Sequence, residues 1–211
     1  MTDQPDSYET LAGEAEAEER ILRSRFIGLA APAPDEAAAQ AFVEATRRRF
    51  HDARHVCHAW RVGPVTGPRD ARQDDGEPSG TAGEPILLAI GGATLHGVVV
   101  AVARYFGGVK LGPGGLARAY GGVAAAALAA APRRTVLLGR RFHLRFDYAQ
   151  QKTVQHLLAS HGGHVETASY AAAITTVLWL PHSTSRAFTH ALHDTTAGRL
   201  LPEPLDEDTP T

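Results

Sequence analysis

A glycine-rich segment between a buried strand and an alanine-rich helix constrains this chain more than any other feature. Residues 104–120 read RYFGGVKLGPGGLARAY, with five glycines among three fixed cations. The preceding run at 96–103 is β-branched and uncharged, which predicts a buried strand. The following run at 121–131 has the alanine density of a helix packed on a sheet. Backbone amides at such a strand-to-helix turn can point toward an anion. The candidate phosphate- or nucleic-acid-binding residues are therefore Arg104, Lys110, Arg118, Gly107, Gly108, Gly112, Gly114 and Gly115.

A second glycine-punctuated segment lies upstream and carries the opposite charge. Residues 73–85 read QDDGEPSGTAGEP. Its carboxylates could supply oxygen ligands to Mg²⁺ together with a nearby hydroxyl, but a short acidic turn is more often solvated or paired with local arginines. We therefore assign no metal and no cofactor. The residues of interest in this acidic loop are Asp74, Asp75, Glu77, Ser79 and Thr81.

Together the two segments resemble the signature of the YigZ/IMPACT family, in which DDGEPxGTAGxP precedes RYFGGxxLGxGGLxRAY. The resemblance extends over residues 18–200, with SRFIGLA at 24–30 and DARHVCHAW at 52–60 similar to the family's first two strands. Pro113 is the one visible departure. The resemblance implies an α+β fold with an N-terminal domain like domain IV of elongation factor G (ribosomal-protein domain 2-like) and a C-terminal ferredoxin-like domain. It also implies a role in regulating translation during a stress response. The eukaryotic members of the family compete for an activator of the kinase that responds to amino-acid starvation.

Composition changes at both ends of the chain suggest four segments. The first nineteen residues hold seven acids and no base, and residues 203–208 add four acids. Acidic segments with few large apolar side chains are typical of disorder. Pro132 should end the alanine-rich helix, so Arg133–Thr135 is interpreted as a linker. We predict a disordered acidic leader at 1–17, an Impact-type N-terminal domain at 18–134, a ferredoxin-like domain at 135–202 and an acidic tail at 203–211.

Within the first domain, the pattern predicts a strand at 20–30, a helix over 36–50 capped by Asp35, and a strand at 54–62. A long loop should then occupy 63–84. A short helix should follow from Pro85 to Ile90.

Beyond the linker, the order β-α-β-β-α-β is the split βαβ pattern of ferredoxin-like domains. Asp147 and Gln150 resemble a capping box at the start of its first helix, and Gly162-Gly163 should close that helix. The strands are expected at 137–146, 164–170, 172–180 and 198–201, and the helices at 148–160 and 183–193.

The charge distribution favours a phosphate-binding surface. The formal net charge is −2, yet residues 20–202 carry twelve acids against twenty-one bases. Residues 85–146 contain eight bases and no acid, as expected of a nucleic-acid-binding surface. The alternative is a scatter of solvated arginines with no common face.

Other chemistries find weaker support. Gly112–Ala117 satisfies G-x-G-x-x-A, but no acid follows about twenty residues later as a dinucleotide site requires. Cys57 is the single cysteine, with His51, His55 and His58 nearby; no second ligand pair stands at zinc-site spacing. A lone cysteine also excludes an intramolecular disulfide, which fits a reducing compartment.

These observations leave two functional hypotheses. The first is a cytoplasmic, non-enzymatic regulator of translation that binds RNA, the ribosome or a ribosome-associated regulatory protein through the basic glycine-rich surface. The second is a phosphate-substrate or nucleotide-binding enzyme that uses the loop at 107–115, with an acid of the upstream loop holding a metal. No secretory signal or membrane span is expected from the sequence.

Overall fold

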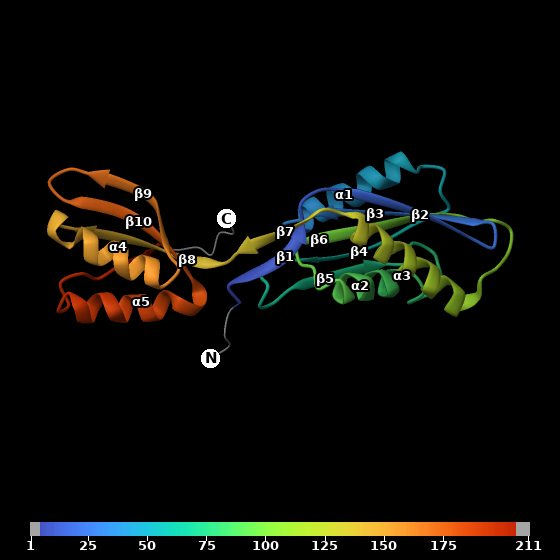
Figure 1. Ribbon diagram of the computed structural model, residues 1–211. Coiled ribbons are helices and arrows are strands. Elements are labelled where there is room, and N and C mark those ends of the chain that lie inside the picture. The colour runs from blue at the N-terminus through green and yellow to red at the C-terminus, as the bar shows by residue number, and fades with distance from the viewer. Residues whose placement is uncertain (1–4, 206–211) are drawn as a thin grey trace. The chain divides into compact units, whose positions relative to one another are not determined.

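The computed structural model describes residues 5–205, and the chain divides into two compact units (Figure 1). Of the described residues, the first unit comprises 9–135, and the second comprises 136–205 together with 5–8. The boundary predicted at 134/135 lies one residue from this division. No feature of the sequence indicated that residues 5–8 belong with the C-terminal unit.

Within the described residues, the first unit is built on a five-stranded antiparallel sheet in the order β2-β3-β6-β4-β5. Helix α1 covers one face of this sheet, and α2 and α3 cover the other (Figure 1). The elements are β2 (Ala15–Ile21), β3 (Ser24–Pro32), α1 (Glu36–Arg49), β4 (His55–Val62), β5 (Arg69–Gln73), α2 (Gly83–Gly92), β6 (Val98–Tyr105) and α3 (Gly112–Ala130).

The position of β6 at the centre of the sheet explains why its sequence is uncharged. Val98, Val100 and Val102 pack against the α2–α3 side, whereas Val99 and Ala101 pack toward α1. Both faces of the strand are therefore buried, which favours a continuous apolar run over alternation. The strand predicted at 96–103 is confirmed with a shift of two residues.

The acidic leader was predicted wrongly. Residues 7–11 form β1 (Ser7–Leu11), which pairs with β7 (Arg133–Leu137), and residues 15–21 form β2. In β2 the acids alternate with Ala15 and Ala17, which pack against the core while Glu16 and Glu18 face solvent. The leader therefore carries the period-2 pattern of a half-buried strand, which its high acid content obscured. Residues 1–4 lie outside the described residues.

Three further predictions in the first unit need correction. The strand expected at 20–30 is a hairpin, because Leu22 and Arg23 both adopt positive φ (44° and 67°) and turn the chain between β2 and β3. The long loop at 63–84 contains the charged edge strand β5, which pairs with β4. The linker at 133–135 belongs to strand β7.

The second unit has the expected ferredoxin-like topology in its described part. Its antiparallel sheet has the order β11-β8-β10-β9, and α4 and α5 pack on one face around Phe188 and Leu178. The capping box of Asp147 and Gln150 is present. The elements are β8 (Gly139–Phe146), η1 (Tyr148–Gln150), α4 (Gln151–Ser160), β9 (His164–Tyr170), β10 (Ile174–Pro181), α5 (His182–Thr195) and β11 (Glu203–Leu205).

The last strand was misplaced in the sequence prediction. It occupies Glu203–Leu205 rather than 198–201 and pairs with β8. The first three residues of the predicted acidic tail are therefore ordered, because they complete the sheet by backbone pairing that does not require apolar side chains. Residues 206–211 lie outside the described residues. Among residues 5–205, no helix combines the length and apolarity needed to cross a membrane.

Candidate anion-binding pocket

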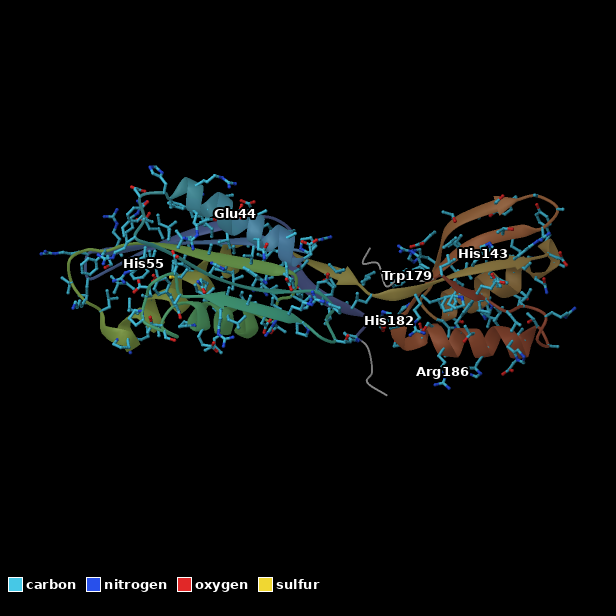
Figure 2. All side chains as sticks on the ribbon, turned by 180° about the vertical axis from the view of Figure 1, so that it is seen from behind. Glu44, His55, His143, Trp179, His182 and Arg186 are labelled. Carbon is cyan, nitrogen blue, oxygen red and sulfur yellow. The ribbon has the colours of Figure 1, made fainter. Side chains whose placement is uncertain are left out.

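A pocket of about 500 Å³ opens in the first unit, where the acidic loop meets the glycine-rich segment. Its wall combines three cations, one histidine and one acid with an apolar lining from Phe106, Leu116 and neighbouring prolines. Figure 2 labels His55, which reaches the pocket from the start of β4. The lining residues are Arg54, His55, Gly76, Glu77, Pro78, Arg104, Phe106, Lys110, Leu111, Gly112, Pro113 and Leu116.

A buried ion pair forms the floor of this site. Nη1 of Arg104 donates to Oε1 of Glu77, and the Tyr120 hydroxyl donates to the same oxygen at 2.8 Å. The side chains of Arg104 and Glu77 are only 6% and 4% exposed. The Arg104 guanidinium lies 5.3 Å from the ring centre of Phe26 and 5.5 Å from that of Phe106, within reach of a cation–π interaction. Burial and the adjoining acid raise the pKa of the Tyr120 hydroxyl, so it remains a donor.

The Nε atom of Arg104 is buried and makes no hydrogen bond within residues 5–205. Buried polar atoms are nearly always hydrogen-bonded in native proteins. Arg104 also lines the pocket, so this donor without a partner belongs to a side chain that borders the site.

The two aspartates of the acidic loop fold the loop rather than face a ligand. Asp74 accepts hydrogen bonds from the amides of Gly80, Ala82 and Gly83 at 2.8 to 3.0 Å, and so caps the start of α2 from a distance. Burial alone would raise the pKa of Asp74, but these three amide hydrogen bonds lower it below its ordinary value.

Asp75 accepts from the Val56 amide at 2.7 Å and from Nη2 of Arg47 at 2.8 Å. These bonds outweigh its burial, and its pKa is also lowered. Ser79 is exposed, and the Thr81 hydroxyl donates to the Pro78 carbonyl.

The acids of this loop therefore do not converge. Asp74, Asp75 and Glu77 each face separate partners, and residues 5–205 hold no cluster of three His, Cys, Asp or Glu side chains that could bind a metal. The arrangement does not support the hypothesis that the acids of this loop hold a metal. It supports the interpretation that arginines and backbone amides neutralise them.

The five glycines of the glycine-rich segment serve different purposes. Gly107 packs against the hairpin turn, since a Cβ there would lie 2.0 Å from the Arg23 carbonyl carbon. Gly108 and Gly112 have positive φ (87° and 71°), which other residues adopt at a cost. Gly114 and Gly115 lie in the first turn of α3. The N-cap residue of this helix, Leu111, makes no side-chain capping hydrogen bond.

Only two of the three cations predicted to bind phosphate reach the pocket. Arg104 and Lys110 line it, whereas Arg118 is exposed on α3 and does not contribute to the lining. Arg54 does line the pocket, and sequence reasoning missed it. Its position follows from the antiparallel pairing of β4 with β6, where the Arg54 amide donates to the Arg104 carbonyl at 3.1 Å. No local sequence signal distinguished Arg54 from other basic residues, such as those that follow Pro132 at the start of strand β7.

The acid-free window at 85–146 does not belong to one unit. Its residues 85–135 lie in the first unit and 136–146 in the second. Arg141, moreover, is paired with Glu166 at 2.8 Å. The candidate site therefore draws on a small part of the window rather than on its full length.

The histidines near Cys57 face different partners. Nδ1 of His55 lies 2.7 Å from the Asp75 carbonyl oxygen, and its Nε2 lies 3.9 Å from Glu77. His58 stacks on Trp60 instead. The Cys57 thiol is buried and donates to the Asp74 carbonyl oxygen, and burial raises its pKa to about 12. This arrangement gives no support to a zinc site or to a nucleophilic cysteine.

Comparison with known proteins gives this site a family context. The model of the Impact N-terminal domain matches residues 22–128, and that of a domain of unknown function, DUF1949, matches residues 144–199. The chain belongs to the IMPACT family. It is 38% identical over 188 residues to IMPACT family member YigZ of Escherichia coli (strain K12), which covers 86% of this chain and 90% of that relative.

Other members of the IMPACT family align over a similar extent. An IMPACT family member in the pol 5′ region of Thermus thermophilus is 44% identical over 184 residues, or 87% of this chain and 99% of the relative. A crystal structure described only as that of a hypothetical protein has a TM-score of 0.66 at 34% identity, covering 96% of this chain and 99% of that one. The similarity to these proteins thus extends over nearly the whole chain.

Proposed function

We propose that this protein is a non-enzymatic, translation-associated factor that binds single-stranded RNA at the pocket of the first unit. The observation that carries the proposal is a set of unpaired cations beside an exposed aromatic ring. Arg54 and Lys110 are exposed and form no ion pair within residues 5–205, and Phe106, which also lines the pocket, is 41% exposed. Cations bind phosphates, and an exposed ring stacks on an unpaired base.

Two further features support an anionic ligand. The pocket is bordered by the N-terminus of α3, a nineteen-residue helix with no side-chain cap and no acid in its first turn. Such a helix end carries partial positive charge. The only acid in the lining, Glu77, already accepts hydrogen bonds from Arg104 and Tyr120, so it opposes an anion less than a free carboxylate would. The link to translation rests on the family resemblance.

Fluorescence anisotropy with an internally labelled single-stranded RNA tests this proposal on the full chain. The double variant Arg54→Ala/Lys110→Ala should weaken binding about tenfold or more, and should flatten the slope of log K against log salt by about 1.4, or 0.7 per lost contact. The matched control is Arg186→Ala/Lys152→Ala, which removes the same charges from the second unit; Figure 2 labels Arg186 on α5.

The control variant should bind as the wild type does, and circular dichroism should show that both variants are folded. A folded pocket variant with wild-type affinity and salt slope would refute the proposal. So would a wild-type protein that binds no RNA at low salt.

A second candidate, a phosphate-substrate enzyme in the same pocket, is favoured by one observation. A carbonyl oxygen only accepts, so the contact with Asp75 places the proton of a neutral His55 on Nδ1 and leaves Nε2 able to take a proton. Incubation with nucleotides, with and without Mg²⁺, would favour this candidate if turnover appears and His55→Gln abolishes it.

A further inference from the structure

We infer that the pocket receives the end of an RNA strand, with the terminal phosphomonoester against the cations and the last base against the apolar wall. The inference rests on the proposed function and specifies its ligand. Three properties of the pocket carry it: the depth of Arg104, the charge of the lining, and the apolar wall.

Depth distinguishes a strand end from the middle of a strand. Arg104 is 5% exposed, yet it lines the pocket, and its Nε has no hydrogen-bond partner among the described residues. A ligand group must therefore enter the pocket to reach this side chain. An internal phosphodiester continues into nucleotides on both sides and cannot enter a pocket without them, whereas a terminal phosphate can.

The charge of the lining matches a phosphomonoester better than a phosphodiester. Three cations, Arg54, Arg104 and Lys110, line the pocket together with one acid, Glu77, which leaves two positive charges in excess. The N-terminus of α3 adds partial positive charge. A phosphomonoester carries a charge of about −1.5 to −2 near pH 7 and presents three acceptor oxygens. An internal phosphodiester carries a single charge and has two free oxygens.

The apolar part of the wall suits one nucleotide. Phe106, Leu111, Leu116 and Pro113 line the pocket beside the cations. The volume of about 500 Å³ lies within the range of pockets that enclose a small organic ligand, about 300–1,000 Å³. A base and its ribose can pack on this wall while the phosphate contacts the cations.

The experiment compares three RNA oligomers of one sequence that carry a 5′-phosphate, a 3′-phosphate or hydroxyls at both ends. Each bears its fluorophore internally, and binding to the full-length protein is measured by anisotropy. We expect one of the phosphorylated oligomers to bind about tenfold more tightly than the hydroxyl-ended one. This preference should disappear in Lys110→Met and persist in Lys152→Met, the matched change at the chain's other lysine.

Each outcome decides a different point. Equal binding of all three oligomers, still weakened by Arg54→Ala/Lys110→Ala, would overturn this inference and leave the proposed function standing. Absence of RNA binding would refute the proposed function and this inference together. A nucleoside monophosphate that competes as strongly as the phosphorylated oligomer would show that the strand contributes nothing, and would overturn the assignment to an RNA end. Inorganic phosphate should compete only weakly, because it leaves the apolar wall empty.

Discussion

Replacement of Glu77 by glutamine should destabilise the first unit strongly. The substitution keeps the shape of the side chain but removes the charge that compensates buried Arg104. Tyr120 would still find an oxygen to donate to, so the main loss is electrostatic. The affected pair lies at the floor of the pocket, where neither side chain exceeds 6% exposure.

The expected cost follows from this burial. Removal of one partner from a buried ion pair typically costs about 3–5 kcal/mol, because the remaining charge is left without compensation. The glutamine oxygen can retain part of the hydrogen bonding, so we expect Glu77→Gln to cost about 3 kcal/mol. Arg104→Met should cost a similar amount. The double variant Glu77→Gln/Arg104→Met should cost less than the sum of the two, by about 2 kcal/mol, because no orphan charge remains.

The assay must report on the first unit by itself. The chain has two tryptophans, Trp60 in the first unit and Trp179 in the second. Urea unfolding followed by fluorescence in a Trp179→Phe background therefore reports the unit that contains the pair. The matched control is Glu84→Gln, which breaks the surface pair with Arg72 and should cost less than about 1 kcal/mol.

Two results would refute the reasoning. One is a Glu77→Gln variant no less stable than Glu84→Gln. The other is a cycle in which the costs of Glu77→Gln and Arg104→Met simply add, which would mean that the two charges do not depend on each other.

Three other predictions follow from the same region. Gly107→Ala should lower the unfolding midpoint because its Cβ would overlap the Arg23 backbone, whereas Gly114→Ala, in an open helical position, should be neutral or stabilise by up to about 1 kcal/mol; thermal unfolding that ranks them the other way would contradict the packing of the loop. Because the folded pKa of Asp74 is lowered, its carboxylate stabilises the fold above the ordinary aspartate range, and that stability is lost as the pH falls toward the folded pKa. Asp74→Asn should therefore destabilise at pH 7, and its difference from the wild type in urea titrations should shrink below about pH 4; a difference that stays constant with pH would exclude this role. Cys57, with its pKa raised to about 12, should react with a thiol reagent at pH 8 only after unfolding, and rapid labelling of the native protein would show that the thiol is accessible.

Much of the local structure could be predicted from the sequence. Asp35 caps α1 by accepting from the Ala38 amide at 2.8 Å, as its place before an amphipathic run indicates. The capping box that opens with Asp147 is also present. These features depend on residues three or four apart, so the sequence contains all the information they need. The glycine-rich segment was likewise placed correctly between a buried strand and a helix.

The predictions failed where a segment is stabilised by a distant partner. The start of strand β2 was taken for part of a disordered leader and β5 for a loop, because their charged residues outnumber their apolar ones. Both are strands because β3 and β4 supply the hydrogen bonds and the core receives their small side chains. Composition alone does not show that such a partner exists.

The family signature, the strand-glycine-helix turn and the residues able to carry charge are all evident from the amino-acid sequence alone. What each charge does depends on the folded chain. Arg104 meets Glu77, twenty-seven positions away, and the pairing of β4 with β6 brings Arg54 to the same pocket. Arg118, fourteen positions after Arg104, faces solvent on α3 instead. The effect of a charge depends on its burial and on the groups opposite it, and both are set by chain pairing between residues far apart in the sequence.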